Sequence, residues 1–327
     1  MDQEIKNGSF GEKDNPLRAE KRRKLGLLRE NGIDPFPHNF KPTHEAHFLM
    51  EKFNHFEAGQ KDPEAKVTLA GRIMTKRDMG KASFFNVKDQ SGQMQVYVRV
   101  QELSEVQKQA FELVDIGDHV GVSGYVFKTQ KGELSVHAQS FNILCKSLEP
   151  LPEKFHGIAD VEIKYRHRHL DLIMSADSCR VFEKRSQIIR EIRKFLDDRG
   201  FLEVETPVLQ PIYGGAAAYP FSTHHRALDM KLFLKISPEL YLKRLIVGGF
   251  NKGYEIGKNF RNEGIDRSHN PEFTMLEYYE AYTDYEDQMS QFETLVSTVC
   301  QRVCGSMQIS YQGKPIDFTP PWRRLRV

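Results

Sequence analysis

Residues 253–282 read GYEIGKNFRNEGIDRSHNPEFTMLEYYEAY. The pattern predicts two antiparallel strands joined by a loop across residues 262–270. Because successive side chains of a strand point to opposite faces, Arg261 shares a face with Asn259 in the first strand. In the second strand one face carries Phe273, Met275, Glu277 and Tyr279. A sheet face that holds a cation, a carboxylate and aromatic rings is unfavourable as a core, so the hairpin is a candidate site.

The side chains of this hairpin suit a nucleotide and an amino acid. An arginine at a strand end can hold a carboxylate and a phosphate together, as adenylate formation requires. An aromatic ring on the same surface can stack on a purine. Glu277, together with Glu239 in the segment ISPELYLKRL, could bind a substrate that has two ammonium groups. The alternative, which the pattern leaves open, is a set of surface ion pairs on an exposed hairpin.

Towards the N-terminus, apolar residues recur with a period of two. Five runs predict strands, at residues 67–75, 82–89, 93–100, 119–127 and 133–144. A helical stretch near residues 101–113 separates the third run from the fourth. Five strands with a helix between the third and the fourth are typical of an OB barrel, a fold that often binds oligonucleotides.

The same parity sorts the side chains of the barrel. It places Phe84, Gln95 and Glu133 on the outer face. The residues expected beside them are Asn86, Lys88, Tyr97, Arg99 and His137. An aromatic ring, an amide, a carboxylate and several cations can stack a splayed base and recognise its edge. The alternative is an ordinary polar barrel surface with one exposed phenylalanine.

The remaining segments are less informative. A helix is predicted between Asn15-Pro16 and Asn31-Gly32. Its basic stripe, which the pattern favours as a solvated face, contains Arg18, Arg22 and Arg29. The run RHRH at residues 166–169 is either a metal site or, as the pattern favours, a solvated or phosphate-facing surface. A helix at 178–200, a strand at 201–209, and further strands and helices up to about residue 302 follow.

Composition describes an ordinary water-soluble chain. The 327 residues are 39% hydrophobic and 28% charged, with a net charge of +2, so any contact with nucleic acid must come from local patches. No apolar run approaches the roughly 20 residues of a membrane span, and the polar N-terminus is unlike a secretory signal. Four scattered cysteines do not suggest a disulfide framework, so we expect a reduced, cytoplasmic protein.

Several motifs carry a resemblance to one family. FRNEG at 260–264 with HNPEFTMLEYY at 269–279 is similar to motif 2 of class II aminoacyl-tRNA synthetases, in the form typical of bacterial lysyl-tRNA synthetases. REIRKFLDDRGFLEVETPVL at 190–209 resembles motif 1 of the same class, which builds a homodimer interface around Pro207. GGAAAYPF at 214–221 and LRAEKRRKLGLLRENGIDPFP at 17–37 also resemble the lysyl enzymes. Several motifs in the right order are far more specific than one.

The resemblance implies roles for individual residues. Arg261 would be the catalytic residue, binding the lysine carboxylate and the α-phosphate of ATP. The ATP contacts would be Arg261, Glu263, His269, Asn270 and Phe273, with Phe273 stacked on adenine. The lysine contacts would be Gly215, Glu239, Arg261, Glu277 and Tyr279. The anticodon of tRNA(Lys) would be read by Phe84, Gln95 and Glu133, which agrees with their outward parity.

The expected fold is α+β, with an OB-fold barrel followed by the N-terminal part of a class II antiparallel-sheet catalytic domain. The expected segments are a lead and basic helix at 1–59, the anticodon-binding barrel at 60–148, a linker at 149–177 and the partial catalytic domain at 178–327. Motif 3 and the acidic ligands of Mg²⁺ do not occur in the sequence. We therefore expect a truncated lysine–tRNA ligase that is inactive alone and contains no metal site of its own.

Two alternatives remain at this stage. One is a stand-alone paralogue that lysylates a translation factor, which shares HNPEFTMLE but lacks a barrel. The other is a non-catalytic module that binds RNA or dimerises.

Overall fold

The structure is a computed structural model that describes residues 15–80, 82–152, 160–266 and 268–325. It divides into two compact units, residues 1–174 and 175–327, and each is considered by itself. The finer division into four segments stays a prediction.

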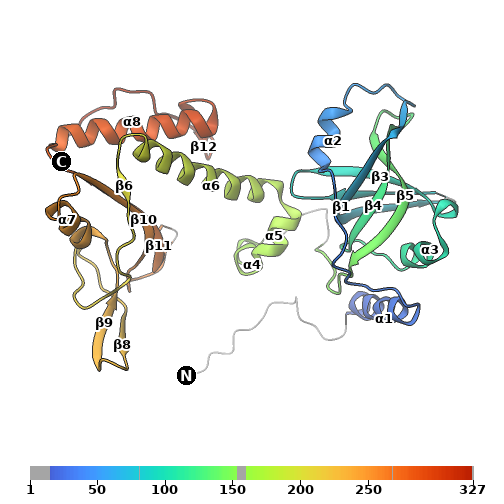
Figure 1. The fold of residues 1–327 in the computed structure, drawn as a ribbon, viewed down its shortest axis with the longest axis horizontal. Helices are drawn as coiled ribbons and strands as arrows, with labels where there is room; N and C mark the ends of the chain where they lie inside the picture. The colour runs from blue at the N-terminus through green and yellow to red at the C-terminus, as the bar shows by residue number, and fades with distance from the viewer. Residues whose placement is uncertain (1–14, 81, 153–159, 267, 326–327) are drawn as a thin grey trace. The chain divides into compact units, whose positions relative to one another are not determined.

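The first unit contains a five-stranded closed barrel (Figure 1). Its strands are β1 (Lys61–Met79), β2 (Ala82–Lys88), β3 (Gln93–Arg99), β4 (His119–Lys128) and β5 (Leu134–Cys145). They are hydrogen-bonded in the order β1-β2-β3-β5-β4, and pairing of β1 with β4 closes the barrel. The 3-10 helix η1 (Val100–Glu102) and α3 (Glu105–Glu112) separate β3 from β4. The predicted strand order is therefore confirmed, although β1 begins at Lys61 rather than at Val67.

Alternate residues of these strands build the barrel core. Phe85, Val87, Met94, Val96, Val98 and Val136 are each at most 1% exposed. The parity predicted from the sequence is confirmed, because their neighbours in the strands, Phe84 and Gln95 among them, are only partly buried on the other face. Gly124 allows β4 and β5 to approach closely, since a Cβ there would lie 1.8 Å from the carbonyl oxygen of His137.

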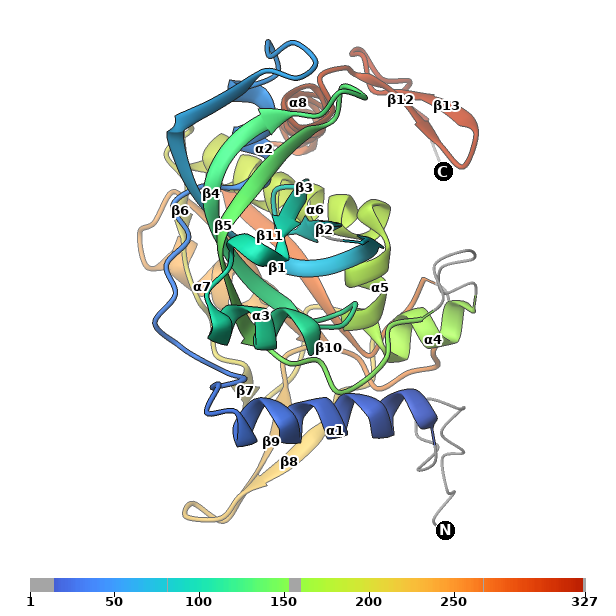
Figure 2. The same cartoon turned by 90° about the vertical axis from the view of Figure 1, so that its right-hand side faces the viewer.

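Two lysines and a leucine dock α1 (Pro16–Glu30) on the barrel. Leu28 is fully buried. Lys21 Nζ donates to the Ile116 carbonyl at 3.0 Å, and Lys24 Nζ pairs with Asp115 at 2.5 Å. In Figures 1 and 2, α1 accordingly lies on the same side of the barrel as α3. Of the predicted basic stripe, Arg22 and Arg29 are exposed, whereas Arg18 pairs with Glu149.

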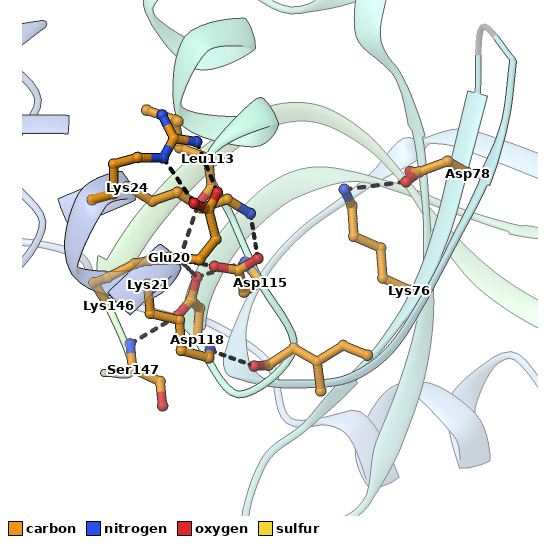
Figure 3. Close-up of polar contacts among 12 residues, drawn as sticks. Glu20, Lys21, Lys24, Lys76, Asp78, Leu113, Asp115, Asp118, Lys146 and Ser147 are labelled. Atoms are coloured by element: carbon orange, nitrogen blue, oxygen red, sulfur yellow. Dashed lines mark hydrogen bonds and ion pairs between the residues drawn. The ribbon is translucent and has the colours of Figure 1, made fainter. Parts of the chain in front are cut away.

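A buried lysine completes this polar cluster (Figure 3). Lys146, directly after β5, is 2% exposed. Its Nζ donates to Asp115 at 2.6 Å, to Asp118 at 2.8 Å and to the Leu113 carbonyl at 2.9 Å. Although burial alone would raise it, the pKa of Asp115 is held below its ordinary value by Lys146 and Lys24. The cluster fixes the turn between α3 and β4, on which α1 rests.

Three short helices were not predicted. They are α2 (Ala46–Lys52), α4 (Val161–Arg166) and α5 (Arg168–Met174). The side chain of Asp160 caps α4 by accepting from the amides of Glu162 and Ile163. The run RHRH therefore spans the end of α4 and the start of α5. Across the described ranges, no three His, Cys, Asp or Glu side chains are grouped so as to hold a metal ion.

The second unit is built on a sheet with the order β11-β10-β6. Its antiparallel hairpin is β10 (Lys252–Phe260) and β11 (Glu272–Glu280), as predicted, and β6 (Leu202–Glu203) pairs with β10 in parallel. The helices α6 (Ala176–Asp197) and α8 (Tyr285–Cys304), which were also predicted, lie side by side (Figure 1). Their core contains Phe195, Leu196, Phe201, Tyr254, Leu295 and Val299.

The strand predicted at 201–209 is wrong in extent. Only β6 and β7 (Leu209–Gln210) form. The chain leaves β10 after the Val204 amide donates to the Tyr254 carbonyl. Pro207 then has no amide proton with which to continue a ladder. β7 joins the sheet β7-β9-β8 instead. The remaining elements of this unit are α7 (Glu239–Val247), β8 (Ser222–His225), β9 (Met230–Leu234), β12 (Gln308–Tyr311) and β13 (Lys314–Asp317).

The strands β8, β12 and β13 gave weak sequence signals, whereas β9 overlaps a strand predicted at residues 232–237. All four residues of β8 are exposed, so its sequence lacks apolar alternation.

Among the described residues, no helix is both long enough and apolar enough to cross a membrane.

Candidate functional site

The β10–β11 hairpin brings Arg261 and Phe273 together. Asn259 stands opposite Phe273 in the register, and the Arg261 amide donates to the Pro271 carbonyl at 2.8 Å, which extends the pairing past β10. The Arg261 guanidinium carbon lies 5.2 Å from the centre of the Phe273 ring. Arg261 Nε is buried and has no hydrogen-bond partner among the described residues. A buried donor without a partner is unfavourable, so this atom marks a place where an anionic ligand would be stabilised.

Apart from Arg261, the residues that were predicted to bind the substrate lysine meet at the other end of the hairpin. Ser237 donates its hydroxyl to Glu277 Oε1 at 2.6 Å, and the Tyr279 hydroxyl donates to Glu277 Oε2 at 3.2 Å. The Glu239 amide donates to Ser237 Oγ at 3.1 Å. Gly215 lies beside them, since a Cβ there would be 2.8 Å from both Glu239 Cβ and Ser237 Oγ. Gly215, Glu239, Glu277 and Tyr279 therefore form one cluster.

The cluster is electrostatically negative. Burial, followed by the charges of Glu277 and Glu239, raises the pKa of Tyr279 far above its ordinary value, so its hydroxyl remains a donor at neutral pH. Glu239 opens α7 and pairs with Lys243 at 2.6 Å. The Lys243 side chain is 57% exposed, so this pair can open at little cost.

Sequence reasoning missed Ser237, although it contacts both carboxylate-bearing segments. It is 2% exposed and stands two residues before Glu239 in the segment ISPELYLKRL. A serine ahead of a helix suggests only a cap, and the pattern gives no sign that its hydroxyl reaches β11.

The other predicted ATP residues lie in the loop after Arg261. Glu263 accepts from the Tyr219 amide at 3.3 Å. His269 Nδ1 lies 2.7 Å from Asp266 Oδ2, and both His269 and Asn270 are exposed. Within the described part of the chain, none of these three side chains contacts Arg261 or Phe273 by a hydrogen bond or ion pair.

A second candidate site lies on the outer face of the barrel. A cavity of about 320 Å³ is lined by Phe84, Gln95 and Glu133, so the structure places the predicted trio together. Arg77 also lines it, opposite Phe84 in the β1–β2 register. The remaining lining residues are Thr75, Met79, Asn86, Thr129, Gln130 and Lys131. Arg77 and Lys131 were missed because the limits predicted for the strands left them outside.

Neighbouring side chains orient the trio. The Phe84 ring packs against Tyr97, with 4.9 Å between ring centres. Ser135 donates its hydroxyl to Gln95 Oε1 at 2.7 Å, which leaves the Gln95 amide group available as a donor. Asn86, opposite Gln95 across β2 and β3, lines the same cavity. The face thus offers a ring, an amide, a carboxylate and cations within one depression.

The four cysteines are free thiols. Cys300 is buried, and its Sγ contacts the Ser306 carbonyl at 3.3 Å. It therefore packs within the unit, as expected for a structural cysteine.

Comparison with known families assigns both units of the chain. The model described as "tRNA synthetases class II (D, K and N)" matches residues 160–327, and the model described as "OB-fold nucleic acid binding domain" matches residues 67–144. The chain belongs to the class II tRNA synthetases. The expected α+β fold, with an OB-fold unit before an antiparallel-sheet catalytic unit, is thereby confirmed.

Individual class II synthetases are similar over almost the whole chain. A lysine–tRNA ligase of Pelotomaculum thermopropionicum is 54% identical over 311 residues, which are 95% of this chain and 60% of the relative. One of Carboxydothermus hydrogenoformans is 54% identical over 302 residues, 92% of this chain and 61% of the relative. One of Clostridium botulinum is 51% identical over 320 residues, 98% of this chain and 62% of the relative. The chain thus spans about 60% of the length of the curated relatives it matches.

Proposed function

We propose that the protein is a lysine–tRNA ligase, which joins lysine to tRNA(Lys) through a lysyl-adenylate and releases AMP and pyrophosphate. The observation that carries the proposal is the Glu277 carboxylate, held by the hydroxyls of Ser237 and Tyr279 on the hairpin that also holds Arg261 and Phe273. A carboxylate whose donors are neutral hydroxyls has no counter-ion among them and suits an ammonium group. The names of the similar relatives support the same substrate.

Arg261 would orient the reacting groups. Its guanidinium can bind the lysine carboxylate and the α-phosphate of ATP, and its unpartnered buried Nε fits such a ligand. Phe273 would stack on adenine, and Glu263, His269 and Asn270 would contact ATP from the loop. No protein nucleophile is needed, because the lysine carboxylate itself attacks the α-phosphorus and pyrophosphate leaves. The protein would contribute orientation and charge stabilisation.

Lysine would be recognised at both of its amines. Glu277 and Tyr279 would bind the side-chain ammonium, while Glu239 and the Gly215 carbonyl would bind the α-ammonium. Lys243 would give up its ion pair with Glu239 when the substrate enters. Mg²⁺ bound with ATP would neutralise phosphate charge, but the described residues offer no acidic cluster to hold it, so no step is assigned to it.

The barrel would read the U-rich anticodon of tRNA(Lys). Phe84 would stack one base, and Gln95 and Glu133 would recognise base edges in the cavity. The barrel also counts against the alternative of a short paralogue acting on a translation factor, since that class lacks it. A cytoplasmic location and a homodimer formed through residues 180–210, with Pro207 near the two-fold axis, complete the proposal. Support for the dimer comes from large exposed apolar side chains in this region, including Val181, Ile188 and Val208.

Lysine-dependent exchange of pyrophosphate into ATP by the full-length protein tests the function. We expect exchange with lysine and little with aspartate or asparagine, the substrates of the other two classes in the family. Absence of lysine-dependent exchange, combined with binding of the anticodon stem-loop, would favour the alternative of a non-catalytic RNA-binding module.

A further inference from the structure

A buried ion pair lies beside the cluster that holds Glu277. Lys235, directly after β9, is 1% exposed, and its Nζ contacts Glu255 in β10, which is 4% exposed. Thr206 donates its hydroxyl to the other carboxylate oxygen of Glu255 at 2.6 Å and lies 3.3 Å from Lys235 Nζ. Both oxygens of Glu255 therefore have partners, and the ion pair is neutral as a whole.

Glu255 stands directly opposite Glu277 in the register of β10 and β11. Residues in this relationship share a face, with Cβ atoms about 4.5–5.5 Å apart, and like charges there repel. Lys235 offsets that repulsion by pairing with Glu255. Glu277 instead receives only the neutral hydroxyls of Ser237 and Tyr279, and it has no ion pair among the described residues. Of these two carboxylates, Glu277 therefore has no cationic partner among the described residues.

The main chain of Lys235 reinforces the arrangement. Its amide donates to the Val208 carbonyl at 2.8 Å, and its carbonyl accepts from the Phe260 amide at 2.8 Å. Phe260 directly precedes Arg261, and Ser237 follows Lys235 by two residues. The position of Lys235 is therefore fixed relative to both parts of the candidate active site.

We propose that Lys235 is a positioning residue that sets the net charge of the amino-acid pocket. It pairs with Glu255, so that the opposed carboxylate, Glu277, stays free to bind the side-chain cation of the substrate. The side-chain end of the pocket then has one carboxylate without a cationic partner among the described residues, which fits an amino acid whose side chain carries one positive charge. This inference rests on the proposed function, because it concerns the same pocket.

Kinetics of lysine-dependent exchange in the full-length protein test the role of Lys235. Glu255→Gln preserves shape and leaves the Lys235 charge free to compete with the substrate for Glu277. We expect KM for lysine to rise at least about tenfold, since like charges brought together in a site are strongly unfavourable. We expect kcat at saturating lysine to change less than about threefold, because a weakened ground-state contact acts mainly on KM.

A double variant separates charge from structure. Lys235→Met combined with Glu255→Gln removes both charges, and replacing a whole buried ion pair is often tolerated. We expect its KM for lysine to return to within about threefold of wild type, that is, within 1 kcal/mol. Tyr254→Phe is the matched control. Tyr254 directly precedes Glu255 in β10, so its side chain points to the opposite face of the sheet. The substitution removes a buried hydroxyl that donates to Asp197. It should lower the unfolding temperature without changing KM for lysine.

The outcomes are distinguishable. Wild type without lysine-dependent exchange would refute the proposed function itself. An active wild type with an unchanged KM in Glu255→Gln would show that Lys235 does not set the pocket charge. A folded double variant whose KM for lysine stays raised would also show that Lys235 does not set the pocket charge. This second test applies even if Glu255→Gln alone does not fold.

Discussion

Ser237 donates its hydroxyl proton to Glu277 across 2.6 Å, which joins the start of α7 to the second strand of the hairpin. The same oxygen accepts from the Glu239 amide at 3.1 Å. One buried hydroxyl thus fixes two carboxylate-bearing residues relative to each other. This geometry lets Glu239 and Glu277 address two amines of one substrate.

Ser237→Ala should therefore weaken lysine binding without unfolding the protein. A hydrogen bond to a charged group contributes about 1.5–3 kcal/mol, so kcat/KM for lysine should fall by roughly 10- to 150-fold. Ser297→Ala is the control, because Ser297 is also buried and donates to a carbonyl, that of Phe318, at 2.7 Å. Equal losses in the two variants would mean that Ser237 serves stability alone.

Phe84→Ala should weaken binding of the tRNA(Lys) anticodon stem-loop by about 1–3 kcal/mol, the usual contribution of one stacked base. Fluorescence anisotropy with a labelled stem-loop measures it. Phe48→Ala, which removes an equally large ring that is 48% exposed on α2, should bind like wild type. Wild-type affinity of Phe84→Ala would show that the ring does not contact the anticodon.

Val181→Asp should disrupt the proposed homodimer. Val181 is 65% exposed on α6. In a two-fold interface each substitution occurs twice, once in each subunit. Sedimentation of the full-length protein should change from dimer to monomer at micromolar concentration. Val161→Asp, at an exposed site on α4, should leave the wild-type dimer intact. A wild-type protein that sediments as a monomer would contradict the proposal directly.

Lys146→Met should destabilise the barrel unit by about 3–5 kcal/mol, since it leaves buried carboxylates without their cation.

The cluster also predicts a pH dependence. The pKa of Asp115 is lower in the folded protein than its ordinary value near 3.8. Its contribution to stability is therefore complete above that value and is lost as the pH falls through the lower, folded pKa. Urea unfolding between about pH 2 and 7 tests this: wild type should lose stability on acidification more steeply than Lys146→Met.

Much of the fold could be predicted from periodicity. The barrel strands alternate buried and exposed residues with few interruptions, so parity alone placed Phe84, Gln95 and Glu133 on one face. The β10–β11 hairpin and both long helices were predicted for the same reason. In contrast, β8 is exposed along its whole length, and α4 is short and polar, so neither has a pattern that reveals it.

The candidate site was predictable only in part. Side chains that share a strand face, such as Phe273 and Glu277, follow from spacing. Ser237 and the pair of Lys235 with Glu255 do not, because they join segments that are distant in sequence and depend on how β9, α7 and the hairpin pack. Motif resemblance supplied roles for single residues, but it gave no information on these contacts.

Lysine-dependent pyrophosphate exchange by Glu277→Gln is the most direct test of the pocket. The substitution preserves the shape of the side chain and removes its charge. One of the two hydroxyls that donate to Glu277 can still donate to the amide oxygen, whereas the other would have to accept from the amide group. In the full-length protein, kcat/KM for lysine should fall by an amount equivalent to about 2–4 kcal/mol, the range for losing one member of a buried charge pair. If wild type and Glu277→Gln agree within about threefold, less than 1 kcal/mol, Glu277 is only a structural residue of the hairpin and the lysine pocket is wrongly assigned.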